Sequence, residues 1–296
     1  MGVECIGVLG FGEVGSMFSN AMAERGARIL VYDSLFEHEP GKQDLASRIQ
    51  YDGIELVTLE EMLSQSEMIL SVVTTEVAEE VALQVAEQLL PRQIYVDLNS
   101  TSPAVKKRIG HAIEIAGASF VEGAILGAVG ATGVATRVLM AGEKGEYVAR
   151  LLKTYGLNTM FYSAEVGKAA TFKMLRSIFS KGLEALMLEL MIAGNRAGIG
   201  DDLWADVTEF MSAHPFDVVA ANWIRTHAVA YERRYHELVQ VLQTMNEVGV
   251  EPIMTSASAS FFERSLSFGF DRTFKHKPEA YGAVVRFMDE RLAEQA

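Results

Sequence analysis

Several residue types are scarce in this sequence. Its 296 residues include a single cysteine, Cys5, so no disulfide can form within the chain. Only six prolines occur and no low-complexity tract is present, which excludes a collagen-like or disordered chain. The six histidines form no HxxH or HxxxH pair, so we expect no metal site.

Positive charge is scarce as well. The 26 lysines and arginines are outnumbered by 39 aspartates and glutamates, which gives a formal net charge of −13. An acidic surface repels the phosphates of nucleic acids and anionic lipids, so we expect neither nucleic acid nor a membrane as a partner. The first apolar run begins almost at Met1 and leaves no room for a signal peptide, so we expect a cytoplasmic protein.

One stretch, residues 115–137, is long and apolar enough to resemble a membrane span. It contains five glycines, however. Each glycine inside a helix costs about 1 kcal/mol relative to alanine. A strand followed by a glycine-rich loop therefore fits this stretch better than a membrane helix does.

The first half of the chain alternates short apolar runs with amphipathic stretches. This alternation predicts repeated βαβ units, and hence an α/β, Rossmann-type doubly wound parallel sheet over residues 1–163. The predicted strands are Cys5–Leu9, Arg28–Tyr32, Met68–Val73, Ile94–Asp97, Ser119–Ala124, Arg137–Ala141 and Thr159–Tyr162. The predicted helices between them are Val14–Arg25, Thr58–Gln65, Val77–Gln88, Pro103–Ala116 and Gly145–Tyr155.

From Ser163 onward the strand pattern stops and helical patterns follow. We expect an all-helical domain over residues 164–296, opened by a long interdomain helix over 164–197 that Ser163 caps and Gly198 ends. Further helices are predicted to start at Asp201, Pro215, Tyr231, Pro252 and Pro278.

A glycine motif, Gly10-Phe11-Gly12-Glu13-Val14-Gly15, follows the first predicted strand and opens a helix. In this setting the first glycine permits a tight turn and the second lets the backbone approach a pyrophosphate. The third allows close packing of the helix on the strand. Together with Asp33 at the end of the second strand, the motif predicts a dinucleotide site; a glycine turn without a ligand is the alternative.

The residues after the second strand indicate which dinucleotide binds. Asp33 can accept hydrogen bonds from the adenosine ribose hydroxyls. Glu37 and Glu39 follow it, and no lysine or arginine occurs before Lys42, so a 2′-phosphate would meet only negative charge. We therefore expect NAD as the cofactor and regard NADP as the less favoured alternative.

Lys173 is the candidate general base. On the expected long helix it shares a register with Ser177, Ser180 and Lys181, and these residues form a narrow polar stripe on an otherwise apolar helix. The stripe predicts that Lys173 lies at the junction of the two halves. A partly buried lysine can give up its proton near neutral pH and act as a base. A solvated surface charge is the alternative interpretation.

The order of these motifs resembles the β-hydroxyacid dehydrogenase family, which includes 6-phosphogluconate and 3-hydroxyisobutyrate dehydrogenases. The helical half resembles a less characterised subgroup with a phosphogluconate-dehydrogenase-like C-terminal domain. The segments that carry the resemblance are the glycine motif, Asp33, Asp97–Pro103, Val121–Gly130, Gly167–Lys173, Arg234–Glu237 and Gly249–Met254.

The resemblance implies roles for particular residues. Lys173 corresponds to the family's general base, and Ser177, where the family usually has asparagine, is expected to orient the substrate. The further cofactor contacts expected from the resemblance are Val73, Thr74 and Asn99. The expected substrate contacts are Ser100, Thr101 and the backbone of Gly123-Ala124-Ile125-Leu126-Gly127.

This chain also departs from the family pattern. Leu126 stands where the family has a carboxylate-binding serine, and the loss of one hydroxyl donor removes about 0.5 to 1.5 kcal/mol. Arg176 is a candidate bidentate partner for the substrate's acid group, although it can equally be a surface arginine. His236 is a further candidate for the substrate pocket, with a structural histidine as the alternative.

Taken together, the sequence predicts an NAD(P)-dependent dehydrogenase that acts on a CH–OH group and transfers a hydride between a small hydroxy acid and the nicotinamide. The alternatives are an imine or keto reductase with a less polar substrate, which Leu126 suggests, and a non-catalytic NAD-binding sensor. Because the helical half is too elongated to bury its apolar stripes alone, we expect a homodimer.

Overall fold

The computed structural model describes residues 4–295. Backbone contacts divide the chain into two units, of which the first ends at Ile178 and the second starts at Phe179. This division falls inside helix α8 (Lys168–Ala197), whereas the predicted boundary lay at residue 163. Each unit has a hydrophobic core of its own.

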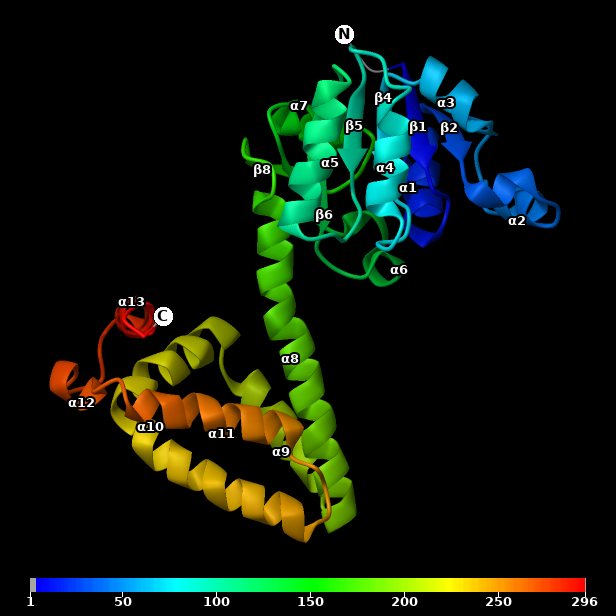
Figure 1. Cartoon of the computed structure of the whole chain (residues 1–296). Coiled ribbons are helices and arrows are strands. Elements are labelled where there is room, and N and C mark those ends of the chain that lie inside the picture. Colours follow the sequence, from blue (N-terminus) through cyan, green and yellow to red (C-terminus); the bar gives the residue numbers. More distant parts are fainter. Residues whose placement is uncertain (1–3, 296) are drawn as a thin grey trace. The chain divides into compact units, whose positions relative to one another are not determined.

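Among the described residues, the first unit holds one sheet of eight strands: β1 (Cys5–Leu9), β2 (Arg28–Tyr32), β3 (Ile54–Leu56), β4 (Met68–Ser71), β5 (Ile94–Asp97), β6 (Ser119–Ile125), β7 (Val138–Ala141) and β8 (Thr159–Ser163). Their spatial order is β3-β2-β1-β4-β5-β6-β7-β8 (Figure 1). Strands β1 to β6 are parallel, which confirms the predicted α/β, Rossmann-type fold.

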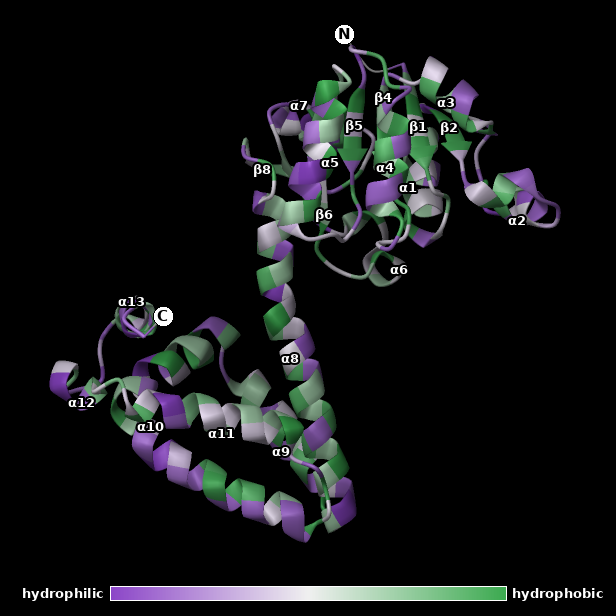
Figure 2. Ribbon diagram, in the orientation of Figure 1, coloured by the Kyte–Doolittle hydropathy of each residue, from purple (hydrophilic) through white to green (hydrophobic). Residues whose placement is uncertain are grey.

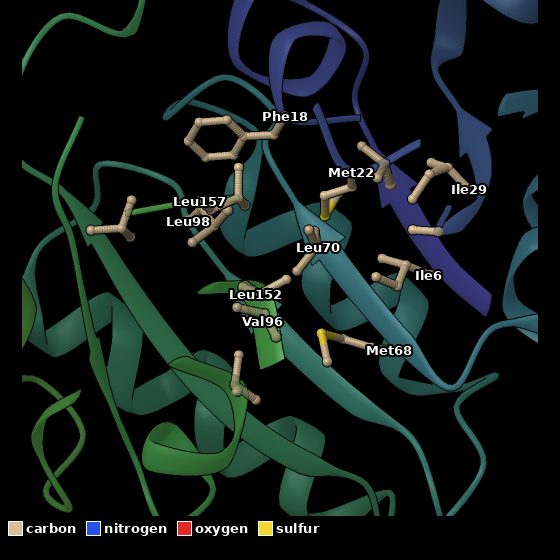
Figure 3. Packing of buried hydrophobic residues seen from close by; sticks show 14 of the residues in the cluster. Ile6, Phe18, Met22, Ile29, Met68, Leu70, Val96, Leu98, Leu152 and Leu157 are labelled. Atoms are coloured by element: carbon tan, nitrogen blue, oxygen red, sulfur yellow. The ribbon is translucent and has the colours of Figure 1, made fainter. Parts of the chain in front are cut away.

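Helices cover both faces of this sheet. Those of the first unit, besides the start of α8, are α1 (Glu13–Glu24), α2 (Gly41–Ser47), α3 (Leu59–Gln65), α4 (Ala78–Ala86), α5 (Pro103–Ile115), α6 (Val129–Thr132) and α7 (Gly145–Thr154), with 3-10 turns η1 (Ser34–Glu37) and η2 (Gly133–Ala135). On one face, Phe18 and Met22 of α1 and Leu152 of α7 pack with strand residues (Figure 3). On the other, α3, α4 and α5 contribute residues such as Met62 and Ile109.

The sheet differs from the sequence prediction at two places. Strand β3, which pairs with β2, was not predicted, because three residues carry too little pattern to identify a strand. Strand β7 runs antiparallel to β6, which corrects the expectation of an entirely parallel sheet. The link between β6 and β7 holds only the short α6 and η2, whereas a parallel neighbour requires a crossover, usually a full helix.

The start of α8 also differs from the prediction. Ser163 is the last residue of β8, and α8 begins at Lys168 rather than at residue 164. In the turn between them, the Ser163 hydroxyl accepts a hydrogen bond from the Glu165 amide at 3.0 Å. Ser163 therefore stabilises the turn and does not cap the helix.

The described residues of the second unit form helices joined by loops: the remainder of α8, then α9 (Gly200–Ala213), α10 (Phe216–Glu247), α11 (Ile253–Leu266), α12 (Phe270–Thr273) and α13 (Tyr281–Ala293). Helix α10 is continuous through Tyr231, so the predicted helix start at that residue is wrong. No glycine or proline lies between Phe216 and Glu247 to break the helix.

Aromatic rings form the core of the second unit. Phe270 is fully buried, and the ring centroids of His227, Tyr231 and Phe287 lie 5.3, 5.0 and 4.8 Å from its own. The Nε2 atom of His227 is hydrogen-bonded with the Ser265 hydroxyl at 3.1 Å. Burial, together with the positive charge of Arg234, lowers the pKa of His227 to about 4.

The helices carry mixed side chains throughout. Figure 2 shows hydrophilic residues interrupting the hydrophobic ones along α8 and α10, the two longest helices. Within residues 4–295, no helix is both long enough and apolar enough to cross a membrane. Part of the apolar stretch 115–137 is instead strand β6.

We predict that acid destabilises the second unit through His227. The folded unit keeps this imidazole neutral down to about pH 4, whereas the unfolded chain protonates it near its ordinary pKa of 6.5. This group therefore leaves the free energy of unfolding unchanged above pH 6.5 and lowers it by about 3 kcal/mol between pH 6.5 and 4. Urea denaturation followed by tryptophan fluorescence measures this unit, because Trp204 and Trp223 both lie in it.

The variant His227→Phe is the control, because a phenyl ring suits the aromatic core and does not titrate. Its stability should fall less over the same pH range. An equal loss in both proteins would show that another group causes the acid sensitivity.

Candidate functional site

The glycine loop, residues Gly10–Gly15, follows β1 at the point where the strand order reverses between β1 and β4. A Cβ on Gly15 would lie 2.1 Å from the Gly10 carbonyl oxygen, so this glycine is what lets α1 pack against the end of β1. A Cβ on Gly12 would meet nothing within 4 Å. The loop therefore leaves open space at the N-terminus of α1, where a pyrophosphate fits.

Asp33 holds this loop in place. Its Oδ2 atom accepts a hydrogen bond from the Phe11 amide at 2.8 Å, and its Oδ1 atom accepts one from the Leu35 amide at 3.0 Å. Each carboxylate oxygen retains a further lone pair for a ribose hydroxyl. Arg48 supports the same loop, because its guanidinium donates to the Phe11 carbonyl at 2.7 Å.

Negative charge is held beside Asp33. The Tyr32 hydroxyl donates to Glu37 Oε1 at 2.7 Å, which fixes Glu37 in η1. Burial and this hydrogen bond to Glu37 raise the pKa of Tyr32 to about 12. Tyr32 therefore stays a neutral donor and keeps the Glu37 carboxylate close to the predicted ribose site.

Two of the other predicted cofactor residues make contacts at or near the loop. Val73 follows β4, and its Cγ1 atom lies 3.2 Å from the position of a Cβ on Gly10. The Glu13 side chain lies against α6, since a Cβ on Gly130 would be 2.1 Å from Glu13 Oε1. Val14 is half-buried in the first turn of α1, and Thr74 is exposed.

The loop after β5 meets the start of α8. The Lys173 ammonium donates a hydrogen bond to the Ser100 hydroxyl, although the two residues lie far apart in the sequence. Asn99 is buried, and both its backbone amide and its side-chain amide donate to Asp97 Oδ1, at 3.0 and 2.7 Å. Thr101 is buried beside them. The structure thus brings the predicted site residues Asn99, Ser100 and Lys173 together.

The remaining predicted residues on α8 have different surroundings. The Ser177 hydroxyl donates to the Lys173 carbonyl at 2.9 Å, so its proton is used inside the helix while its oxygen can still accept. Arg176 is exposed. His236 lies in the second unit, on the exposed surface of α10 beside Glu232 and Arg233.

The segment Gly123–Gly127 is mostly part of the sheet. Gly123, Ala124 and Ile125 pair with β7, and the Leu126 amide donates to the Arg137 carbonyl at 2.8 Å. The Leu126 side chain is buried with those of Ala124, Leu139, Ala141 and Ala169. Gly127 is the first residue of the segment that is exposed.

A buried ion pair beneath the Ser100 loop was not singled out from the sequence. Lys106 Nζ lies 3.0 Å from Asp97 Oδ2 and donates to the Asp97 carbonyl at 2.9 Å. Both side chains are buried almost completely. The sequence did offer one sign of this pair, because Asp97 is a charged residue at the end of an apolar strand. It gave no indication that Lys106, on the following helix, is its partner.

The sheet, the glycine loop and the Ser100–Lys173 contact define the fold of an NAD(P)-binding oxidoreductase. Residues 5–163 match the family described as the NAD binding domain of 6-phosphogluconate dehydrogenase. This match covers more than half of the chain, so the chain belongs to that family, which confirms the resemblance noted from the sequence. Residues 195–265 match a domain of unknown function, DUF1932.

Two individual proteins are similar to this chain over most of its length. An uncharacterized 28.5 kDa protein of Methanothermus fervidus is 25% identical over 259 residues, which are 87% of this chain and 97% of that protein. A conserved protein of unknown function, described as structurally similar to 3-hydroxyacid dehydrogenases, is 28% identical, with a TM-score of 0.60 over 88% of this chain and 96% of its own.

Imine reductases share the fold. The enzyme from Myxococcus stipitatus in complex with NADP+ is 18% identical, with a TM-score of 0.77 over 96% of this chain and 99% of its own. A variant of that enzyme is known in complex with NAD+. The fold therefore accommodates either dinucleotide.

We predict that Gly12 and Gly15 respond differently to alanine. Gly12→Ala should leave the first unit folded, because the added methyl meets no protein atom, but it should weaken NAD binding at least about tenfold by entering the pyrophosphate space. Gly15→Ala should instead destabilise the unit by about 2 kcal/mol or more, because the methyl collides with the Gly10 carbonyl. Calorimetric titration with NAD and thermal unfolding measure the two effects. Unchanged affinity in folded Gly12→Ala would mean that the loop does not bind the phosphates.

Proposed function

We propose that the chain is an NAD-dependent dehydrogenase that interconverts a small hydroxy acid and the corresponding keto acid. The observation that supports this proposal most directly is the hydrogen bond from Lys173 to Ser100. It puts an amine and a hydroxyl at the carboxyl edge of the sheet, the edge at which the glycine loop lies. Ligands of open α/β sheets bind along this edge.

In the proposed reaction, Lys173 in its amine form accepts the proton of the substrate hydroxyl. The Ser100 hydroxyl holds the Lys173 nitrogen in place and can also form a hydrogen bond with the oxygen of the substrate hydroxyl. A nicotinamide ring bound at this edge would provide the carbon that accepts the hydride. Loss of the hydroxyl proton to Lys173 and of the hydride from the adjoining carbon leaves a carbonyl group, and the reverse reaction returns both.

The acid group of the substrate needs its own anchor. The Leu126 amide is already bonded and the Leu126 side chain is buried, so neither suits a carboxylate. Arg176, exposed one turn beyond Phe172 on α8, is the cation that we assign to this role, and Ser177 orients the substrate through its free lone pairs.

An imine or keto reductase is the second candidate. The buried Leu126 supports it, because the position that the resemblance gives to a carboxylate-binding serine offers no hydroxyl here. Such an enzyme would reduce less polar substrates and show little activity toward hydroxy acids. Absorbance assays at the nicotinamide band, with a panel of hydroxy acids and a panel of cyclic imines, separate the two. If the protein binds NAD but converts neither panel, the result would favour the third alternative, a non-catalytic NAD-binding sensor.

The cofactor preference follows from the charges beside the ribose. We predict that NAD binds at least tenfold tighter than NADP, about 1.4 kcal/mol, because Asp33 and the fixed Glu37 repel a 2′-phosphate. Glu37→Gln should narrow this ratio, whereas Glu60→Gln, an exposed change on α3, should leave it unaltered. Titration calorimetry with each dinucleotide gives the ratio, and equal dissociation constants in the unaltered protein would refute the preference.

Replacing Lys173 tests the mechanism. Lys173→Met keeps the length of the side chain and removes the base, so turnover should fall about a hundred- to ten-thousand-fold while NAD affinity is unchanged. Lys168→Met is the matched control, because Lys168 lies on the same helix but its side chain is half exposed and paired with Glu165. Near-native turnover of Lys173→Met on a verified substrate would refute the assignment of the base.

A homodimer is the assembly that we propose. In the second unit, Phe179, Leu188 and Ile192 of α8 and Trp204 of α9 are each at least half exposed. So many large apolar side chains on adjoining helices favour burial against another protein surface, and a second copy is the simplest partner. Light scattering should give twice the mass of the chain at micromolar concentration, and a monomer would refute the proposal.

A further inference from the structure

Glu122 is a fully buried acid on β6, in register with Asp97 at the carboxyl end of β5, and it has no part in the proposed mechanism. Its Oε1 atom accepts hydrogen bonds from the Gly167 amide at 2.9 Å and the Ala169 amide at 2.8 Å. These amides belong to the start of α8, where helix N–H groups have no partner within the helix. A carboxylate from β6 therefore caps the helix that carries Lys173.

The cap lies close to Lys173 along the helix. Ala169 and Lys173 are four residues apart, so they share one face of α8 and lie about 6 Å apart along its axis. Any shift or tilt of the first turn moves the Lys173 side chain with it. The position of the first turn therefore affects where the amine meets Ser100.

A buried charge pair lies beside Glu122. Asp97 and Glu122 are register partners on β5 and β6, and Lys106 pairs with Asp97 beside them. Burial raises the pKa of the Glu122 carboxyl, while the amide hydrogen bonds and the charge of Lys106 oppose this rise. Burial outweighs both, so the pKa of Glu122 lies above its ordinary value.

The two acids support the two partners of the Lys173–Ser100 contact. The Asp97 carboxylate accepts a hydrogen bond from the amide of Asn99, which directly precedes Ser100. The Glu122 carboxylate accepts hydrogen bonds at the start of α8. We propose that Glu122 is a positioning residue that fixes Lys173 against Ser100 by anchoring the start of α8. The catalytic part of this inference rests on the proposed function, whereas the structural part does not.

The variant Glu122→Gln tests the inference. The amide keeps an oxygen that can accept from Gly167 and Ala169 but removes the charge that strengthens both bonds. Glu165→Gln is the matched control, because it removes an exposed carboxylate near the same end of α8 without touching the cap. Both variants are studied as the full chain at a temperature at which they remain folded.

Two readouts need no substrate. In Glu122→Gln, hydrogen exchange at the Gly167 and Ala169 amides should be at least about tenfold faster, because a neutral acceptor binds them more weakly. Lys173 should react faster with an amine-modifying reagent, relative to the exposed Lys153 of α7 in the same chain. Glu165→Gln should change neither rate. Unchanged rates in Glu122→Gln would overturn the inference whatever reaction the enzyme catalyses.

The third readout is kinetic. On a verified substrate, Glu122→Gln should lower kcat about 10- to 100-fold with KM and NAD affinity within about twofold, because a misplaced base affects the chemical step most. A role limited to stability would lower the melting temperature and leave kcat unchanged. If Lys173→Met proves active, the proposed function fails, but the exchange and labelling rates still decide whether Glu122 positions Lys173.

Glu122→Asp covers the case in which Glu122→Gln does not fold. It keeps the charge beside Lys106 but is one methylene shorter, so α8 must move toward β6 or lose its cap. The inference requires faster exchange at Gly167 and a lower kcat in this variant as well. Native values for both would overturn it.

Discussion

The first unit depends on how it buries charge at the carboxyl edge of its sheet. Removing Asp97, Lys106 and Glu122 from water is costly, and the cost is offset only when each group has well-placed partners. Those partners come from a loop, a helix and the start of a second helix. These contacts connect the loop after β5, helix α5 and the start of α8 around the Ser100–Lys173 contact.

The second unit uses a similar arrangement. Glu189, on its part of α8, accepts hydrogen bonds from the Met254 and Thr255 amides and from the Thr255 hydroxyl, at 2.7, 2.9 and 2.7 Å. Burial raises the pKa of Glu189, but these hydrogen bonds more than offset it, so the carboxyl pKa lies below its ordinary value. In each unit, a carboxylate from another element caps a helix at its N-terminus.

Leu126 is one position at which this chain departs from the pattern that the resemblance implies. Leu126 contributes to a small core with Ala169 and Leu139 instead of offering a hydroxyl. The neighbours by fold include both 3-hydroxyacid dehydrogenase-like proteins and imine reductases. The fold alone therefore does not decide which substrate this chain takes.

The sequence by itself determined the dinucleotide-binding half, because apolar periodicity and the spacing of Gly10, Gly12 and Gly15 are local properties. It also indicated Lys173 and the loop at Ser100. It did not determine the antiparallel β7, the continuity of α10 through Tyr231 or the start of α8, for which Ser163 was the nearest local cap. Only the tertiary structure decided that Glu122, 45 residues before Gly167, caps this helix. A partner from a distant strand leaves no periodic pattern in the sequence, because its effect depends on burial and on hydrogen-bond geometry that arise only on folding.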